Sequence, residues 1–229
     1  MTKTKYPCEL ALASGLVLTA LSVCLFLRSG LGVTVISSVP LMLHYTFPFI
    51  DFGVWNMIFN AAMLVLAVVL LKRARASYIV SLFMAVIYGA LIDLFKPVVF
   101  MLPISLPLSI LYFLLSMLAL SVGIAFYMKC RLPLLPCDVF IRDAVIAYRI
   151  PYRKVKTIFD ISCLAVSLVF CFAVLGELRD IGIGTVVSAI TTGSCVAFFM
   201  RRMDSAFEFE PAIPAVGRFV NRDEAISKR

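Results

Sequence analysis

The sequence predicts an all-α polytopic membrane protein: six transmembrane helices in two inverted three-helix repeats, each repeat with an extra short re-entrant or interfacial helix. Hydrophobic residues make up 62% of the 229 residues and charged residues only 15%, whereas a soluble domain is nearer half apolar and a quarter charged. The apolar residues form runs long enough to cross a bilayer. Basic residues gather at the ends of these runs, and short motifs recur about one hundred residues apart in the chain.

Six apolar runs give the expected spans. They cover residues 10–27, 52–71, 77–95, 107–128, 155–175 and 182–200. Each is close to the roughly 20 residues that a hydrocarbon core of about 30 Å requires. The first run follows Lys3 and Lys5, as in a signal peptide, but it has no clear small-residue cleavage site. We therefore expect it to be retained as a span.

The distribution of basic residues predicts the orientation. Of the 21 Lys and Arg residues, all but three fall in the N-terminus, the 72–76 loop, the 129–156 segment and the tail after the last span. Only Arg28, Lys96 and Arg179 fall on the opposite side. Because Lys and Arg are retained on the cytoplasmic side, both termini are expected in the cytoplasm. The net charge of +8 is thereby accounted for without a nucleic-acid partner.

Three matches in the same order indicate an internal repeat. They pair Ala20-Leu21-Ser22-Val23 with Ala119-Leu120-Ser121-Val122, and Ile58-Phe59-Asn60 with Ile158-Phe159-Asp160. The third pairs Ala85, Gly89 and Asp93 with Ala189, Gly193 and Ala197, with the offset changed by four residues. An odd number of spans per copy inverts the second copy, as in many secondary transporters. The expected organisation is a cytoplasmic N-terminus (1–9), a first membrane repeat (10–100), an inverted second repeat (101–202) and a cytoplasmic tail (203–229).

Each copy contains an extra short helix between its first two spans. Residues 33–46 lie between a Gly-rich break and Pro48, and residues 137–150 lie between Pro136 and Pro151. Gly and Pro interrupt helices for backbone reasons. A helix of about 14 residues rises only about 21 Å, which is too short to span a bilayer. Each is therefore re-entrant or interfacial, and the sequence leaves both alternatives open.

The two short helices differ in character. The first places Ser37, Ser38 and His44 on one face. The second places Asp138 on the same side as the arginines, opposite an apolar side, a pattern typical of a cationic helix lying against anionic lipid. The expected cytoplasmic basic surface consists of Arg142, Arg149, Arg153 and Lys154.

Asp160 is the first candidate for a functional residue, because a carboxylate inside a span costs about 2.5–3.5 kcal/mol on insertion scales and usually faces a cavity or a partner. Lys156 lies one turn earlier, at the spacing of a helical ion pair. Two interpretations stay open: a substrate or proton site, or an ion pair about one turn inside the headgroups. Asn60, the counterpart of Asp160, lines a pathway or forms an interhelical hydrogen bond.

Further candidates lie near the ends of other spans. Asp93 precedes Lys96, so it forms a shallow ion pair or an ion or proton site. Gly182-Ile183-Gly184-Thr185 opens the last span, where free backbone N–H groups could bind an anion or Thr185 could act as a simple N-cap. The expected substrate or ion pathway therefore comprises Asp160, Lys156, Asn60, Asp93, Ser37, Ser38, Gly184 and Thr185.

Four motifs resemble the YczE/YyaS/YitT group of bacterial integral membrane proteins, over roughly residues 10–200. These are Ser37-Ser38-Val39-Pro40, Gly89-Ala90-Leu91-Ile92-Asp93, the segment from Lys154 to Asp160, and Gly182-Ile183-Gly184-Thr185. The resemblance implies a bacterial inner-membrane protein and supplies no known substrate.

The leading functional hypothesis is a secondary transporter or permease for a small molecule or ion. The alternative is a non-transporting interaction or regulatory subunit, including the substrate-capture subunit of a larger importer; a lipid-binding membrane organiser is a third. No nucleophile–base pair, phosphate loop or metal cluster stands out, so we expect no enzymatic activity, cofactor or metal. The expected partners are the lipid bilayer and a small-molecule or ion substrate. A homo-oligomer is compatible with the sequence but not indicated. The seven cysteines are expected to be small buried thiols.

Overall fold

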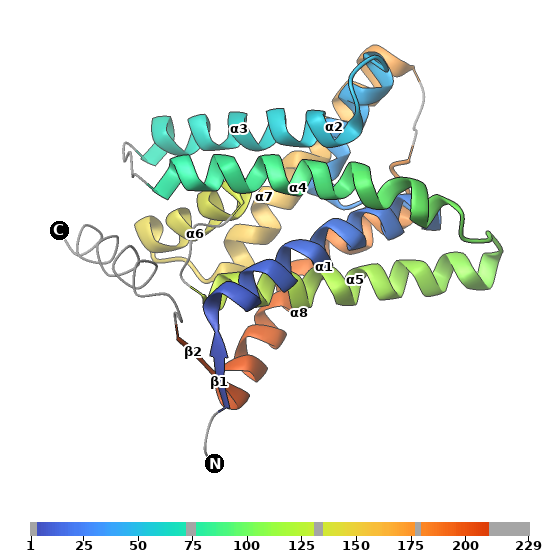
Figure 1. Cartoon of the computed structure of the whole chain (residues 1–229). Coiled ribbons are helices and arrows are strands. Elements are labelled where there is room, and N and C mark those ends of the chain that lie inside the picture. Colours follow the sequence, from blue (N-terminus) through green and yellow to red (C-terminus); the bar gives the residue numbers. More distant parts are fainter. Residues whose placement is uncertain (1–3, 72–76, 131–134, 177–179, 211–229) are drawn as a thin grey trace.

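The computed structural model describes residues 4–71, 77–130, 135–176 and 180–210, and it is mostly helical (Figure 1). The elements in order are β1 (Thr4–Pro7), α1 (Cys8–Ser29), α2 (Val35–Thr46), α3 (Phe52–Leu71), α4 (Ser77–Phe100), α5 (Leu106–Lys129), α6 (Pro136–Tyr148), α7 (Tyr152–Phe170), the π-helical turn η1 (Cys171–Leu175), α8 (Ile183–Ala206) and β2 (Phe207–Glu210).

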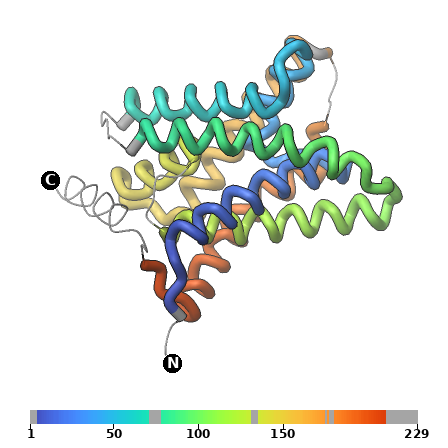
Figure 2. Tube along the Cα trace, in the orientation of Figure 1, coloured from blue at the N-terminus to red at the C-terminus, as the bar shows by residue number. Residues whose placement is uncertain are grey.

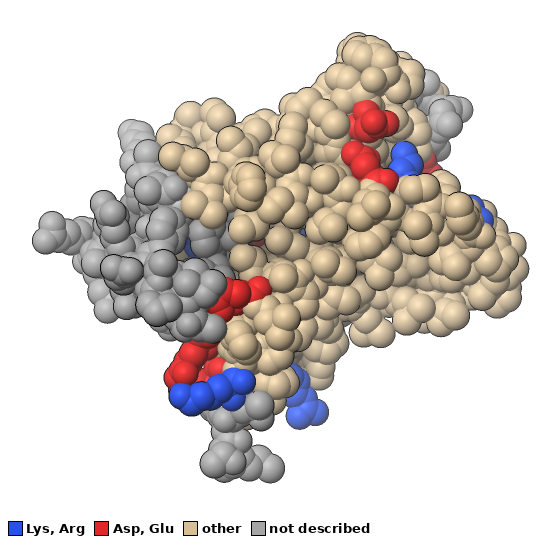
Figure 3. Space-filling model, viewed as in Figure 1, with Lys and Arg blue, Asp and Glu red and all other residues tan. Residues whose placement is uncertain are grey.

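Among the described residues, six helices, α1, α3, α4, α5, α7 and α8, are long and apolar enough to cross a membrane. They match the six predicted spans and are typical of a multi-pass membrane protein. Several extend beyond the predicted ends; α4, for example, continues through Pro97 to Phe100. Many large apolar side chains, such as Val65 and Ile79, are exposed on the outside, as lipid-facing side chains would be. On the face seen in Figure 3, charged residues gather towards two ends and leave a broad uncharged band between them.

The two short helices form where the sequence predicts them. At the start of α2, the Thr34 side chain accepts a hydrogen bond from the Ser37 backbone N–H. Pro136 is the first residue of α6, a position where its missing N–H costs nothing. Arg149 ends α6 with a positive φ of 54°, directly before Ile150 and Pro151.

The helices pack in matched pairs. Helices α1 and α5 contact each other most extensively and run side by side through the molecule (Figure 2). Around them, α1 packs on α4 as α5 packs on α8, and α3 packs on α4 as α7 packs on α8. Each short helix also reaches the other half of the chain, since α2 packs on α7 and α6 packs on α3. The interior is therefore enclosed by both halves.

Small residues allow the closest of these crossings. A Cβ on Gly15 would lie 2.8 Å from the Gly123 carbonyl oxygen, and a Cβ on Gly89 would lie 2.7 Å from that of Gly53. A Cβ on Gly193 would lie 3.2 Å from the Arg153 carbonyl oxygen. Gly15, Gly89 and Gly193 therefore serve close helix packing.

The two ends of the described chain meet. Strands β1 and β2 pair in parallel, and Lys5 lies 2.9 Å from Glu210. The first residues of the predicted tail (203–229) are ordered, because α8 continues to Ala206 and β2 follows it. Residues 211–229, the rest of the predicted tail, lie outside the described residues.

Candidate functional site

A cavity of about 40 Å³ lies in the interior. Each of the eight α-helices that the structure describes contributes a polar side chain to its wall, either from the helix itself or from its N-cap. These side chains are Thr19, Thr34, Ser37, Asn56, Asn60, Tyr88, Tyr127, Asp138, Lys156 and Thr192. The volume holds about two or three water molecules.

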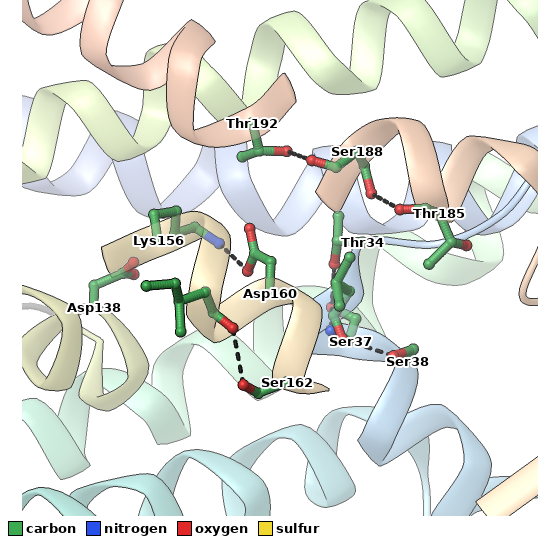
Figure 4. Close-up of polar contacts among 12 residues, drawn as sticks. Thr34, Ser37, Ser38, Asp138, Lys156, Asp160, Ser162, Thr185, Ser188 and Thr192 are labelled. Atoms are coloured by element: carbon green, nitrogen blue, oxygen red, sulfur yellow. Dashed lines mark hydrogen bonds and ion pairs between the residues drawn. The ribbon is translucent and has the colours of Figure 1, made fainter. Parts of the chain in front are cut away.

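The predicted ion pair of Lys156 with Asp160 is present. The Lys156 Nζ lies 2.5 Å from Asp160 Oδ1, and their side chains are only 3% and 2% exposed. Both project from α7, and Lys156 lines the cavity (Figure 4). Because α7 begins at Tyr152, Asp160 lies two turns inside the helix. The pair belongs to the interior of the molecule rather than to its surface.

Asp138 is a site residue that the sequence analysis placed wrongly, on the basic, lipid-facing side of the second short helix. It is only 4% exposed and lines the cavity. Its Oδ2 accepts a hydrogen bond of 2.7 Å from the Tyr127 hydroxyl, and its Oδ1 has no hydrogen-bond partner among the described residues. Burial raises the pKa of the Asp138 carboxyl to about 6, against the opposing effects of the Tyr127 hydroxyl and the Lys156 ammonium.

Asn56 and Asn60 occupy the matching positions in the first half, one hundred residues before Lys156 and Asp160. The Asn60 side chain donates to the Asn56 carbonyl oxygen (2.9 Å) and accepts from the Cys137 backbone N–H (3.4 Å) at the start of α6. The predicted interhelical hydrogen bond of Asn60 is confirmed. Asn56, which the sequence analysis missed, lines the cavity, and its buried Nδ2 has no hydrogen-bond partner among the residues that the structure describes. Extending the repeat match by one helical turn would have found it.

The two predicted serines have different surroundings. Ser37 lines the cavity and accepts a hydrogen bond of 2.8 Å from the Thr34 hydroxyl. Ser38 is absent from the cavity wall, and its hydroxyl lies 2.6 Å from that of Ser167 on α7. Ser38 therefore joins α2 to the other half of the chain, whereas Ser37 faces the site.

Gly184 and Thr185 bind the loop between α1 and α2 and do not line the cavity. The Gly184 N–H donates to the Leu31 carbonyl oxygen (2.9 Å), and the Thr185 hydroxyl accepts from the Val33 N–H (3.0 Å). The N-cap of α8 is Gly182, so the N-cap prediction for Thr185 is wrong. The N–H of Gly184, which the anion hypothesis required to be free, is used to bind the loop between α1 and α2.

Asp93 does not form the predicted ion pair with Lys96, although the structure describes both residues. Its Oδ1 accepts a hydrogen bond of 2.9 Å from the Gly53 N–H at the start of α3. The Lys96 ammonium lies over the Phe52 ring, 5.9 Å from its centroid. Asp93 thus acts as an N-cap supplied by another helix.

Asp93→Ala is expected to destabilise the protein by about 1–2 kcal/mol, because it leaves the Gly53 N–H without its acceptor. Thermal unfolding of the purified protein in detergent measures the effect. Asp93→Asn is the control, since its amide oxygen can still accept this bond. Equal melting temperatures for the Ala and Asn variants would argue against the capping role.

The predicted basic surface lies at the turn between α6 and α7. Arg149, Arg153 and Lys154 are exposed. Arg142 is half-buried, and its Nε lies 3.3 Å from Asp143 Oδ1. Three of the four side chains are thus available to a lipid headgroup or a protein partner.

Comparison with known proteins gives one match. A family model described as a family of unknown function (DUF6198) matches residues 8–201. No curated protein and no solved structure matches the chain.

Proposed function

Because this chain belongs to DUF6198, a family of unknown function, we propose its function from its own geometry: it is a small secondary transporter or permease for a small molecule or ion. One observation carries the proposal, the interior cavity lined by polar groups from all eight described α-helices. Buried polar groups without partners are costly. Within the described ranges, the cavity wall contains two such groups, Asp138 Oδ1 and Asn56 Nδ2, which suits it to a transient occupant.

The inverted repeat predicted from the sequence would support alternating access. Each helix contact within the first half has its counterpart in the second, and the short helices exchange partners across the halves. In this proposal, α2 and α6 enter from opposite sides and meet at the cavity, as in transporters whose sites lie between inverted repeats. The resemblance to the YczE/YyaS/YitT group, and a bacterial inner-membrane location with cytoplasmic termini, remain predictions consistent with this plan.

The mechanism that follows is rocking of the two halves about the contact between α1 and α5. Gly15 and Gly123 let the two backbones approach closely at this contact, since a Cβ on Gly15 would lie 2.8 Å from the Gly123 carbonyl oxygen. At about 40 Å³ the cavity accommodates an ion or a few waters. A larger substrate therefore requires the halves to separate.

Flux through reconstituted protein tests the proposal. Proteoliposomes are expected to carry sodium ions or protons down an imposed gradient, measured with radioactive sodium and an internal pH dye. Asn56→Leu, which removes a polar group of the cavity wall, is expected to reduce this flux at least tenfold. Thr191→Ala is the control, because Thr191 lies outside the cavity wall and its hydroxyl donates to the Val187 carbonyl oxygen of its own helix. Flux no greater than that of empty liposomes would contradict ion-coupled transport.

A second candidate function is a non-transporting interaction or regulatory subunit, including a substrate-capture subunit of a larger importer. The observation that favours it is the exposed basic group of Arg149, Arg153 and Lys154 at the turn between α6 and α7. A stoichiometric partner that copurifies with the wild type, but not with a charge-reversed variant of these residues, would support it over transport.

A further inference from the structure

The charges around the cavity do not balance. Among the described residues, the cavity wall contains two ionisable side chains besides its tyrosines and Cys137, and these are Asp138 and Lys156. The Lys156 ammonium is already held by Asp160 at 2.5 Å. The groups that act on Asp138 are Tyr127 of α5, Tyr88 of α4, Cys137 of its own helix, and Tyr152, Lys156 and Asp160 of α7. With both carboxylates ionised, this cluster has a net charge of −1.

Asp138 is the group left uncompensated. Tyr127 donates to its Oδ2, while its Oδ1 has no partner within the described part of the chain. A buried carboxylate without a counter-charge is strongly unfavourable, and it either gains a partner or takes up a proton. A single positive charge restores neutrality, whereas a divalent cation would leave the cluster with a net charge of +1.

The surroundings of Asp138 also fit a small cation. Oxygen-bearing side chains line the same cavity: the hydroxyls of Thr19, Thr34 and Tyr88 and the amide of Asn56. Oxygen ligands suit hard cations, and the thiol of Cys137 does not alter that preference. A cavity of about 40 Å³ has room for one such ion with about one or two waters.

We propose that this cavity binds one monovalent cation, a sodium ion or a proton, at the free carboxylate oxygen of Asp138. The inference rests on the proposed transport function, for which it supplies the coupling site. Lys156 and Asp160 remain paired and set the charge of the site, while Asp138 gains and loses the cation.

The same helix provides a matched control. Asp143 also lies on α6 and is 6% exposed, and its Oδ2 accepts a hydrogen bond of 2.7 Å from the Tyr78 hydroxyl. Its other oxygen lies 3.3 Å from Arg142 Nε, and it is absent from the cavity wall. Asp138→Asn and Asp143→Asn thus make the same chemical change on one helix, inside and outside the proposed site.

The test measures melting temperature in detergent at constant ionic strength, with sodium replaced by N-methylglucamine. If sodium is the ligand, the melting temperature of the wild type at pH 8 rises by roughly 3–6 °C for each tenfold increase in sodium above its Kd. If the proton is the ligand, the melting temperature without sodium falls as the pH is raised from about 4 to 6, and it is level at higher pH. The reason is that the folded state holds the proton more tightly than the unfolded state. Asp138→Asn removes either response and Asp143→Asn retains it.

A wild type whose melting temperature responds to neither sodium nor pH over these ranges overturns the inference, whether or not the variants fold. An unchanged response in a folded Asp138→Asn also overturns it. Tyr127→Phe is a second variant that retains the carboxylate, and it should move the pH midpoint upward because the carboxylate loses a hydrogen-bond donor. A melting temperature that responds to sodium or pH, without flux in proteoliposomes, would confirm the site and contradict transport. Flux without such a response of the melting temperature would support transport and contradict the site.

Discussion

Lys156→Met is expected to destabilise the protein by about 3–5 kcal/mol, because it leaves a buried carboxylate without its counter-ion. The Asp160 side chain is only 2% exposed, and the Lys156 ammonium at 2.5 Å is the cation paired with it. The drop in melting temperature, on the order of 10 °C, is measured by thermal unfolding in detergent at neutral pH. An exposed i,i+4 pair would contribute only about 0.3–0.5 kcal/mol.

The first half of the chain supplies the control for this prediction. Asn56 and Asn60 stand at the positions matching Lys156 and Asp160. The double variant Lys156→Asn/Asp160→Asn copies that neutral pattern and removes both charges together, so it is expected to recover most of the stability lost in Lys156→Met. A double variant as unstable as the single one would show that packing, rather than unpaired charge, dominates at this position.

Gly32→Ala is the second substitution with a large expected effect. Gly32 has a φ of +135°, and an added Cβ would lie 2.5 Å from the Thr185 Oγ1 and 2.6 Å from its backbone nitrogen. Both the backbone strain and the clash with α8 act against alanine, so we expect a loss of about 3 kcal/mol or more. Thermal unfolding and the yield of monodisperse protein measure it.

A variant at Gly30 distinguishes the effect of backbone strain from that of the clash with α8. Its φ is +66°, and an added Cβ would meet nothing within 4 Å. Gly30→Ala should therefore cost only the strain of a left-handed residue, about 1–2 kcal/mol. Similar losses for both glycine variants would contradict the close contact between the Gly32 loop and α8.

The sequence predicts the spans and the ion pair well, because each depends on local spacing. Hydrocarbon thickness determines the length of a span, and one helical turn determines the contact of Lys156 with Asp160. Asp138 was placed wrongly because the side of a short helix that faces inward depends on its tertiary partners. Its partner Tyr127 lies on the preceding span, and local periodicity carries no information about that contact.

The same limit explains the start of α8. Its glycines suggest free N–H groups, yet the acceptor for Gly184 is the carbonyl of Leu31, in the other half of the chain. The pairing of β1 with β2 was also missed, because two four-residue segments at distant positions have no periodicity that distinguishes them from a loop.

The β1–β2 pair has a consequence for biogenesis. Strand β1 precedes all six spans in the chain, and β2 follows the last of them. During synthesis, the contact between Lys5 and Glu210 therefore cannot form until α8 has been made and has packed against α5. A nascent chain that stalls before the last span leaves this strand without its partner, so the small sheet closes only on a completely inserted protein.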